Sequence, residues 1–332
     1  MATTPAIAQA FGFSQVHVFG DSLVDTGNLL NVTGGLIPPQ PFYTNGRFSN
    51  GSVWVEYLSP ELGLTYDPSS NFAFGGATSG TTNTINNLIP LPGLPGLQQQ
   101  VNGFTQATSA DPHALYILSA GANDYLGGGV TNPATPVNNL KDAISALVAD
   151  GAKNILISNV PDLGNLPGTR QNQVVAQQLT ALSVAHNSLL AQTLGILKPS
   201  LDPSVNLVTL DVFSLLNSAI ANPTSVGLTN ATDSCLSPPP LLNPGTIPAV
   251  CSNPDTYLFW DDIHPTTTGH RQVAEFAFST LNSAAVPEPP ATLGLLTFGI
   301  FLAGAAALKR RNHRKIRSFS PTGCAATGEE SS

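Results

Sequence analysis

Short runs of apolar residues recur along the first two thirds of the chain, and each run ends in turn-forming residues. The runs are four to six residues long and rich in Val, Ile and Leu, as is typical of parallel strands buried on both faces. They predict four buried strands, at residues 16–19, 114–119, 154–158 and 205–210.

Segments with helical spacing of apolar residues alternate with these strands. They predict a helix that begins at 52–58 and further helices over 137–149, 172–197 and 267–281. The apolar positions expected on one face are Leu140, Ile144 and Leu147 in the second helix, Val175, Leu179, Leu182, Ala185, Leu189 and Leu194 in the third, and Val273, Ala277 and Leu281 in the fourth. Alternating strands and helices predict an α/β fold with a parallel sheet and right-handed crossovers.

The composition indicates a folded, acidic body. Hydrophobic residues make up 42% of the 332 residues and charged residues 10%, which argues against intrinsic disorder. Residues 11–285 carry six basic and seventeen acidic side chains, and the other six basic residues lie between Lys309 and Arg317. An acidic surface repels phosphate backbones, so no nucleic acid is expected as a partner.

The C-terminal region has the order of a membrane anchor. A Pro-rich linker at 285–290 precedes eighteen apolar residues at 291–308 and a basic tail at 309–332. Eighteen helical residues span about 27 Å, close to a bilayer core of ~30 Å. We therefore predict a transmembrane helix with a cytoplasmic tail and a body outside the membrane; the alternative is a buried core helix.

This C-terminal pattern resembles the PEP-CTERM sorting signal, because Val-Pro-Glu-Pro, an apolar span and a basic cluster follow one another over 286–311. The resemblance implies an exported protein of a Gram-negative bacterium, processed by an exosortase, and either anchored or released at the cell surface. The extension over 312–332 departs from the usual pattern. At the other end, 1–13 is either the remnant of a signal peptide or an ordinary terminus.

The segment around Ser22 carries the first candidate chemistry. The predicted strand stops abruptly at Gly20-Asp21-Ser22, and a serine on such a turn is held outward from the core, with backbone N–H groups nearby. These are the requirements of an acyl-transfer nucleophile. Far downstream, Asp261 and His264 are three residues apart, so that a carboxylate and an imidazole can meet on one tight turn.

Two more blocks, at 71–77 and 121–124, complete a pattern that resembles the GDSL, or SGNH, hydrolase family over residues 14–284. The resemblance implies a three-layer α/β/α sandwich with a central parallel sheet, similar to flavodoxin. It implies a nucleophile at Ser22, a general base at His264 and an orienting carboxylate at Asp261. Asp262 is the competing carboxylate.

The same resemblance implies an oxyanion hole built from the backbone N–H of Ser22, a glycine N–H and an asparagine side chain. These correspond to Gly76 and Asn123, with Gly75 as an alternative to Gly76. No cofactor is implied. No second histidine or cysteine accompanies His264 at ligand spacing, so no metal site is expected.

Three long segments lack periodicity, at 29–51, 77–111 and 222–256. The last is rich in proline and is predicted to pack as a flap near 261–265. It contains Cys235 and Cys251, which we expect to form a disulfide in an oxidising compartment and to stay as thiols in a reducing one.

The leading functional prediction is a serine esterase or lipase that hydrolyses carboxylic esters through an acyl-enzyme. Its substrates would be acyl lipids, small esters or acetylated polysaccharides, as the resemblance implies. The alternatives are a binding or matrix protein of the cell surface on a hydrolase scaffold, and an acyltransferase that shares the acyl-enzyme.

Overall fold

The computed structural model describes residues 12–88, 93–240, 243 and 245–285. The helices are α1 (Asn28–Val32), α2 (Trp54–Glu61), α3 (Leu97–Ala107), α4 (Ala122–Leu126), α5 (Ala134–Asp150), α6 (Pro167–Arg170), α7 (Gln173–Leu197), α8 (Val212–Ala221) and α9 (Thr267–Ala285). Short 3-10 helices are η1 (Pro68–Ser70), η2 (Thr84–Asn87), η3 (Lys198–Ser200), η4 (Pro223–Val226) and η5 (Pro254–Thr256).

The predicted strands form one parallel sheet. It has four strands in the order β1 (Val16–Gly20), β2 (Leu115–Ser119), β3 (Asn154–Ser158) and β4 (Asn206–Leu210). Val18, Ile117, Leu156 and Val208 lie side by side across the sheet. Because every strand runs the same way, all four carboxyl ends reach one edge, where ligands bind in open parallel sheets.

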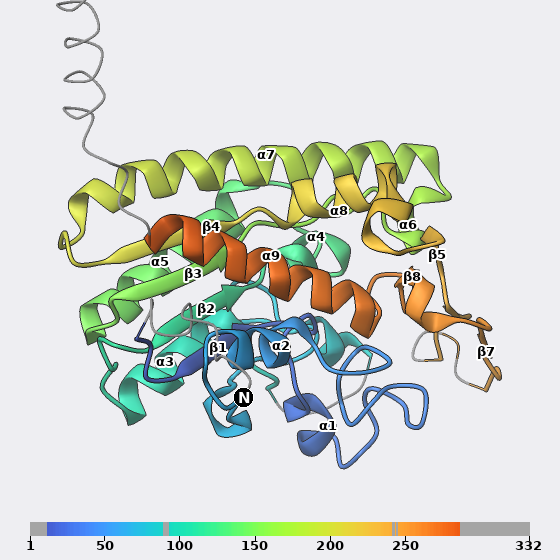
Figure 1. The fold of residues 1–332 in the computed structure, drawn as a ribbon, viewed down its shortest axis with the longest axis horizontal. Helices are drawn as coiled ribbons and strands as arrows, with labels where there is room; N and C mark the ends of the chain where they lie inside the picture. The colour runs from blue at the N-terminus through green and yellow to red at the C-terminus, as the bar shows by residue number, and fades with distance from the viewer. Residues whose placement is uncertain (1–11, 89–92, 241–242, 244, 286–332) are drawn as a thin grey trace, which may run out of the picture. The chain divides into compact units, whose positions relative to one another are not determined.

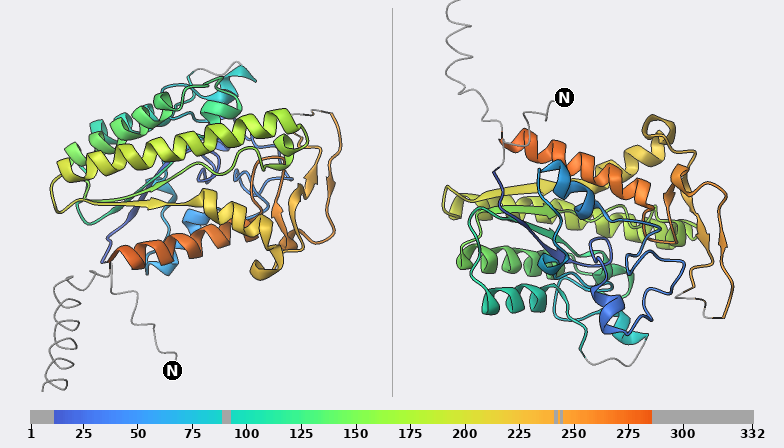
Figure 2. Two further views of the ribbon diagram at one scale, coloured as in Figure 1. Left: turned by 90° about the horizontal axis from the view of Figure 1, so that it is seen from above. Right: turned by 60° about the horizontal axis from the view of Figure 1, so that its bottom comes forward.

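Helices cover both faces of the sheet. On one face Phe19, Tyr116 and Leu118 pack with residues of α3, α5 and α7. On the other face Val18 and Ile117 pack with residues of α2 and α9. In Figure 1 and in the left view of Figure 2, α7 (yellow-green) and α9 (orange) lie on opposite sides of β4. The predicted three-layer α/β/α sandwich is confirmed.

The sequence patterns did not predict α3, α4, α6 or α8, and the apolar face predicted for α7 is only partly correct. In α3 only Leu97, Gln100, Val101 and Phe104 are buried, and intervening Gln and Gly residues hide their periodicity. The buried residues of α7 are Ser183, His186, Leu190 and Leu194. Val175 and Ala185 are exposed, and Leu179, Leu182 and Leu189 are half-buried. Four of the six predicted residues therefore contact the core, and the centre of the contact face is shifted because Ser183 and His186 occupy it.

The proline-rich segment packs against the segment around Asp261, as predicted. Strand β5 (Asn230–Ser234) pairs with β8 (Tyr257–Phe259), and β6 (Leu236–Ser237) pairs with β7 (Ala249–Val250). The Leu236 amide donates to the carbonyl of Trp260 at 2.6 Å. Cys235 and Cys251 form a disulfide, which is the state expected of them in an oxidising compartment.

The segments predicted at the two ends fall largely on residues 1–11 and 286–332, outside the described part of the chain. They include the membrane span at 291–308 and the basic tail at 309–332. Within the described residues, no helix combines the length and apolar character needed to cross a bilayer.

Candidate active site

The turn after β1 holds Ser22 at the carboxyl edge of the sheet. Gly20 has φ +155°, and a Cβ there would lie 2.1 Å from the carbonyl oxygen of Ser119. Only glycine therefore allows β1 to lie this close to β2 at its last residue. The next amide, of Asp21, donates to the same Ser119 carbonyl at 3.1 Å, and the chain then turns at Ser22.

Ser22, His264 and Asp261 form a chain of hydrogen bonds. Ser22 Oγ lies 2.8 Å from His264 Nε2, across 242 positions of sequence. On the other side of the ring, His264 Nδ1 lies 2.8 Å from Asp261 Oδ2 and 2.9 Å from Oδ1. Nδ1 carries the ring proton and donates it to the carboxylate in a hydrogen bond. Nε2 is then unprotonated and accepts the hydrogen bond of the serine hydroxyl. All three side chains are buried.

A tight turn orients the carboxylate toward the imidazole. Asp261 Oδ1 accepts hydrogen bonds from the backbone N–H groups of Ile263 at 2.9 Å and His264 at 2.8 Å. The competing Asp262 instead accepts from Ser234 Oγ at 2.7 Å. The structure therefore brings Asp261, and not Asp262, to the imidazole.

Tyr43, which no sequence motif marks, completes the surroundings of Asp261. The Tyr43 hydroxyl donates to Asp261 Oδ2 at 2.7 Å and is buried. Burial by itself would raise the pKa of Asp261, but the charge of His264 and the hydrogen bonds around the carboxylate hold it below its ordinary value. Tyr43 belongs to the aperiodic segment 29–51, where no local pattern marks a residue with a partner 218 positions away.

The candidate oxyanion donors border one cavity. Ser22, Gly76, Asn123 and His264 all line a cavity of about 480 Å³. Gly75 is a poorer candidate than Gly76, because its amide already donates to the Asp25 carboxylate at 2.8 Å. No described residue accepts a hydrogen bond from the Gly76 amide. Asn123 Nδ2 donates to the carbonyl of Ala77 at 3.1 Å, which leaves its second N–H for another acceptor.

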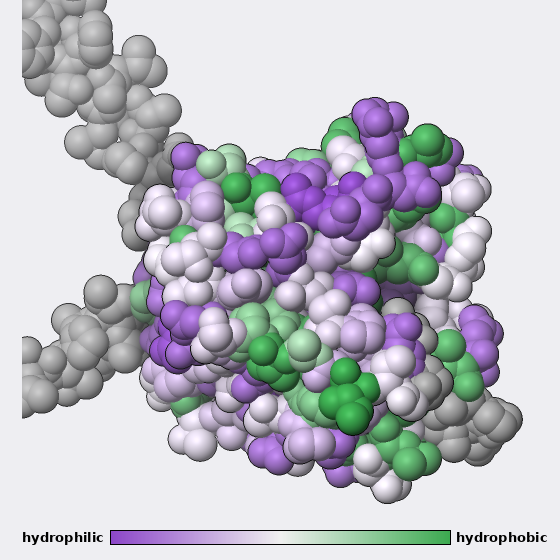
Figure 3. All heavy atoms as spheres, turned by 90° about the vertical axis from the view of Figure 1, so that its right-hand side faces the viewer, coloured by the Kyte–Doolittle hydropathy of each residue, from purple (hydrophilic) through white to green (hydrophobic). Residues whose placement is uncertain are grey.

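The rest of this cavity is mixed in character. The apolar part of its wall is formed by Phe48, Ile85, Leu88 and Leu126. Of these, Leu88 is 52% exposed. Figure 3 shows the face on the right-hand side of Figure 1, where hydrophobic side chains lie beside a hollow in the surface. Within the described residues, no three His, Cys, Asp or Glu side chains converge as metal ligands.

The class of protein follows from the fold together with a family match. The architecture is the GDSL hydrolase fold, a three-layer sandwich with a parallel central sheet. Residues 16–277 match the family model described as GDSL-like Lipase/Acylhydrolase. The chain belongs to this family.

Two relatives and one solved structure are similar to this chain. The chain is 32% identical over 313 residues to the phosphatidylcholine-sterol acyltransferase of Aeromonas hydrophila, covering 82% of this chain and 91% of that protein. It is 29% identical to the thermolabile hemolysin of Vibrio parahaemolyticus, covering 84% and 66%. The native aryl esterase of M. smegmatis matches with a TM-score of 0.48 at 14% identity, covering 81% and 99%.

Proposed function

We propose that the protein hydrolyses carboxylic esters through an acyl-enzyme formed on Ser22. The observation that carries the proposal is the continuous chain of hydrogen bonds from Ser22 through His264 to Asp261. A serine hydroxyl becomes a strong nucleophile only when a neighbouring base takes its proton, and the imidazolium that forms needs a fixed anion. Membership of a family of lipases and acylhydrolases supports the same reaction.

In the proposed mechanism, Ser22 Oγ attacks the ester carbonyl while His264 Nε2 accepts the hydroxyl proton. The amides of Ser22 and Gly76 and the side chain of Asn123 stabilise the oxyanion of the tetrahedral intermediate. His264 then gives its proton to the leaving alcohol, and the acyl group stays on Ser22. A water molecule, deprotonated by His264, releases the carboxylic acid and restores the serine. Asp261 remains ionised throughout.

The test is hydrolysis of p-nitrophenyl esters of increasing chain length by Ser22→Ala. We expect kcat to fall by about 10³-fold or more, because the nucleophile is lost while binding is kept. Ser188→Ala, on the exposed side of α7, is the matched control and should keep full activity. A fluorophosphonate probe should label the unmodified protein and not Ser22→Ala. Unchanged hydrolysis by Ser22→Ala, or folded protein that the probe does not label, would favour a binding protein instead.

Acyl transfer is the second candidate, and one observation favours it. The Aeromonas hydrophila relative, 32% identical over most of both chains, is named an acyltransferase. Transfer would use the same acyl-enzyme, with an alcohol in place of water. Adding an alcohol to the assay distinguishes the two: a transferase forms the new ester at the expense of free acid.

We also propose that the protein is exported. The tail over 286–311 resembles a PEP-CTERM signal, and the Cys235–Cys251 disulfide suits an oxidising compartment. An exosortase-type enzyme would process the tail, and 291–308 would hold the unprocessed chain in the membrane. Fractionation of the source cells with mass measurement of the mature chain tests this proposal. Reduced, full-length protein in the cytoplasm would contradict it.

A further inference from the structure

A second cavity lies beside the turn that carries Ser22. Its volume is about 90 Å³, and its lining includes Ser119 and Ser158, the last residues of β2 and β3. Asp21 and Leu23, the neighbours of Ser22 in sequence, also line it. Ser22 and His264 themselves line only the larger cavity. The second cavity is thus separate from the candidate active site and lies at the edge where parallel sheets bind ligands.

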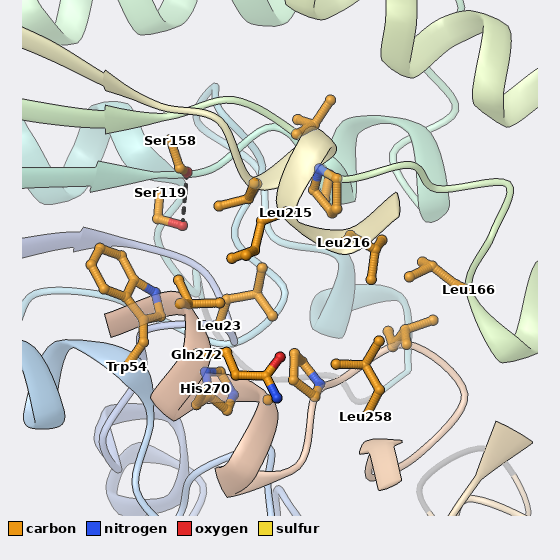
Figure 4. A pocket seen from close by; sticks show the side chains of 18 of the residues that line it. Leu23, Trp54, Ser119, Ser158, Leu166, Leu215, Leu216, Leu258, His270 and Gln272 are labelled. Atoms are coloured by element: carbon orange, nitrogen blue, oxygen red, sulfur yellow. Dashed lines mark hydrogen bonds between the residues drawn. The ribbon is translucent and has the colours of Figure 1, made fainter. Parts of the chain in front are cut away.

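The walls of this second cavity are mostly apolar. Figure 4 shows Leu215 and Leu216 of α8 on one side and Leu23, Trp54 and Leu258 on the others. None of its lining residues is Lys or Arg. An anion would lose its hydration here without a compensating positive charge, which strongly disfavours anionic ligands.

One polar group in the wall lacks a partner. His270 of α9 is 1% exposed, and neither ring nitrogen has a hydrogen-bond partner within the described residues. Figure 4 shows its ring beside Gln272 among the lining side chains. Burial lowers the pKa of His270 to about 3, so the imidazole is neutral and presents one donor and one acceptor. A buried imidazole in this state is stabilised by a ligand group that can both give and receive a hydrogen bond.

The carboxyl group of Asp21 further limits the chemical class of ligand that this cavity can bind. Asp21 is one of the residues that line the same cavity, and burial raises the pKa of its carboxyl group to about 7. When ionised it repels a carboxylate, and when protonated it offers nothing to an ammonium ion. A hydroxyl on an apolar chain suits both states, because it donates or accepts as needed and carries no charge.

The volume sets the length of that chain. An apolar cavity of about 150 Å³ holds benzene, with six carbon atoms. By the same ratio, a cavity of about 90 Å³ encloses roughly four non-hydrogen atoms. A fifth non-hydrogen atom would extend toward Leu215, Leu216 and Gln272, which line the cavity and are half-buried.

We propose that this second cavity is a binding site for short-chain primary alcohols, whose hydroxyl bonds to His270 and whose alkyl chain packs against the leucines of the wall. An alcohol is also what ester hydrolysis would release. The site itself does not depend on that reaction, so it is tested by binding alone.

The experiment follows the ring nitrogens of His270 by ¹H–¹⁵N NMR while 1-butanol is added to the full chain. The His270 signals, assigned by their loss in His270→Phe, should shift and saturate with a Kd on the order of millimolar, as expected for five non-hydrogen atoms. His186 is the internal control. It is equally buried and its Nε2 also lacks a partner, but it does not line this cavity, so its signals should stay in place.

Two comparisons make the result decisive. Butyrate and butylammonium match 1-butanol in length but carry charge, and they should leave His270 unshifted. Ala219→Met fills the cavity from α8 and should abolish the shift. If Ala219→Met does not fold, Leu216→Trp, at the half-buried side of the cavity, is the alternative cavity-filling variant. The proposal is overturned by the absence of saturation up to about 50 mM alcohol, by equal shifts with either ion, or by a shift that persists in the filled variant.

Discussion

The hydroxyl of Tyr43 offers the most direct test of the geometry around Asp261. It donates to a carboxylate that is 3% exposed, at 2.7 Å. Tyr43→Phe removes this one oxygen atom and leaves the ring, which packs 6.0 Å from the ring of Phe48, in place. The variant therefore changes the hydrogen bonding of Asp261 with little change in packing.

A hydrogen bond to a charged group contributes about 1.5–3 kcal/mol, so we expect the free energy of unfolding to fall by about 2 kcal/mol at pH 7. In the proposed mechanism His264 becomes positively charged in the transition state, where it depends most on a fixed carboxylate. If about half of this lost free energy destabilises the transition state relative to the ground state, kcat falls about 5-fold. KM should change by less than about twofold, since the lost bond reaches Asp261 and not the substrate.

The pH dependence of stability gives a second readout. The pKa of Asp261 lies below its ordinary value of 3.8, so its stabilising contribution is present above that value and is lost as the pH falls through the folded-state pKa. The stability difference between the unmodified protein and Tyr43→Phe should be constant from about pH 8 to 5 and shrink only below about pH 4.

The assay is urea unfolding together with ester hydrolysis, and the matched control is Tyr116→Phe. The Tyr116 hydroxyl donates to a neutral acceptor, the carbonyl of Asp111, at 3.1 Å. Its removal should cost about 1 kcal/mol and leave kcat unchanged. If Tyr43→Phe matches this control in both stability and kcat, the reasoning about Asp261 is refuted.

Three other predictions concern neighbouring features. Gly76→Ala places a Cβ 2.6 Å from two side chains at φ +78° and should lower kcat by about 10²-fold with little change in KM; full activity would remove Gly76 from the oxyanion hole. Replacing Cys235 and Cys251 by serine opens a link across 16 residues and should cost about 3 kcal/mol, or a Tm roughly 5–10 °C lower by calorimetry. Burial raises the pKa of Asp21 to about 7 from 3.8, so the folded state binds the extra proton and stability falls as the pH rises between these values. Asp21→Asn should remove this slope and be a few kcal/mol more stable than the unmodified protein at pH 8; an unchanged slope in urea titrations would contradict the raised pKa.

Local patterns in the sequence were enough for the strands and the chemistry-bearing turns. The four strands are short apolar runs, and Gly20 before Ser22 marks the end of the first. Burial follows this composition in β1, β2 and β3, whereas β4, at the edge of the sheet, buries only Leu207 and Leu210. Asp261 and His264 are three residues apart, so one tight turn is sufficient to join them. Helix α5 ends at Asp150 and is capped by Gly151 in the left-handed conformation, within one residue of the predicted end at 149.

Tertiary structure decided what no local window contains. The choice of Asp261 over Asp262 depends on Ser234, which occupies the second carboxylate, and the preference for Gly76 over Gly75 depends on Asp25. Tyr43 reaches Asp261 only because the segment 29–51 packs against the C-terminal part of the domain. Helix and strand periods report which side of an element is apolar, whereas hydrogen bonds between distant polar groups depend on how whole elements pack. A linear pattern therefore identifies candidate reactive groups, and only packing selects their partners.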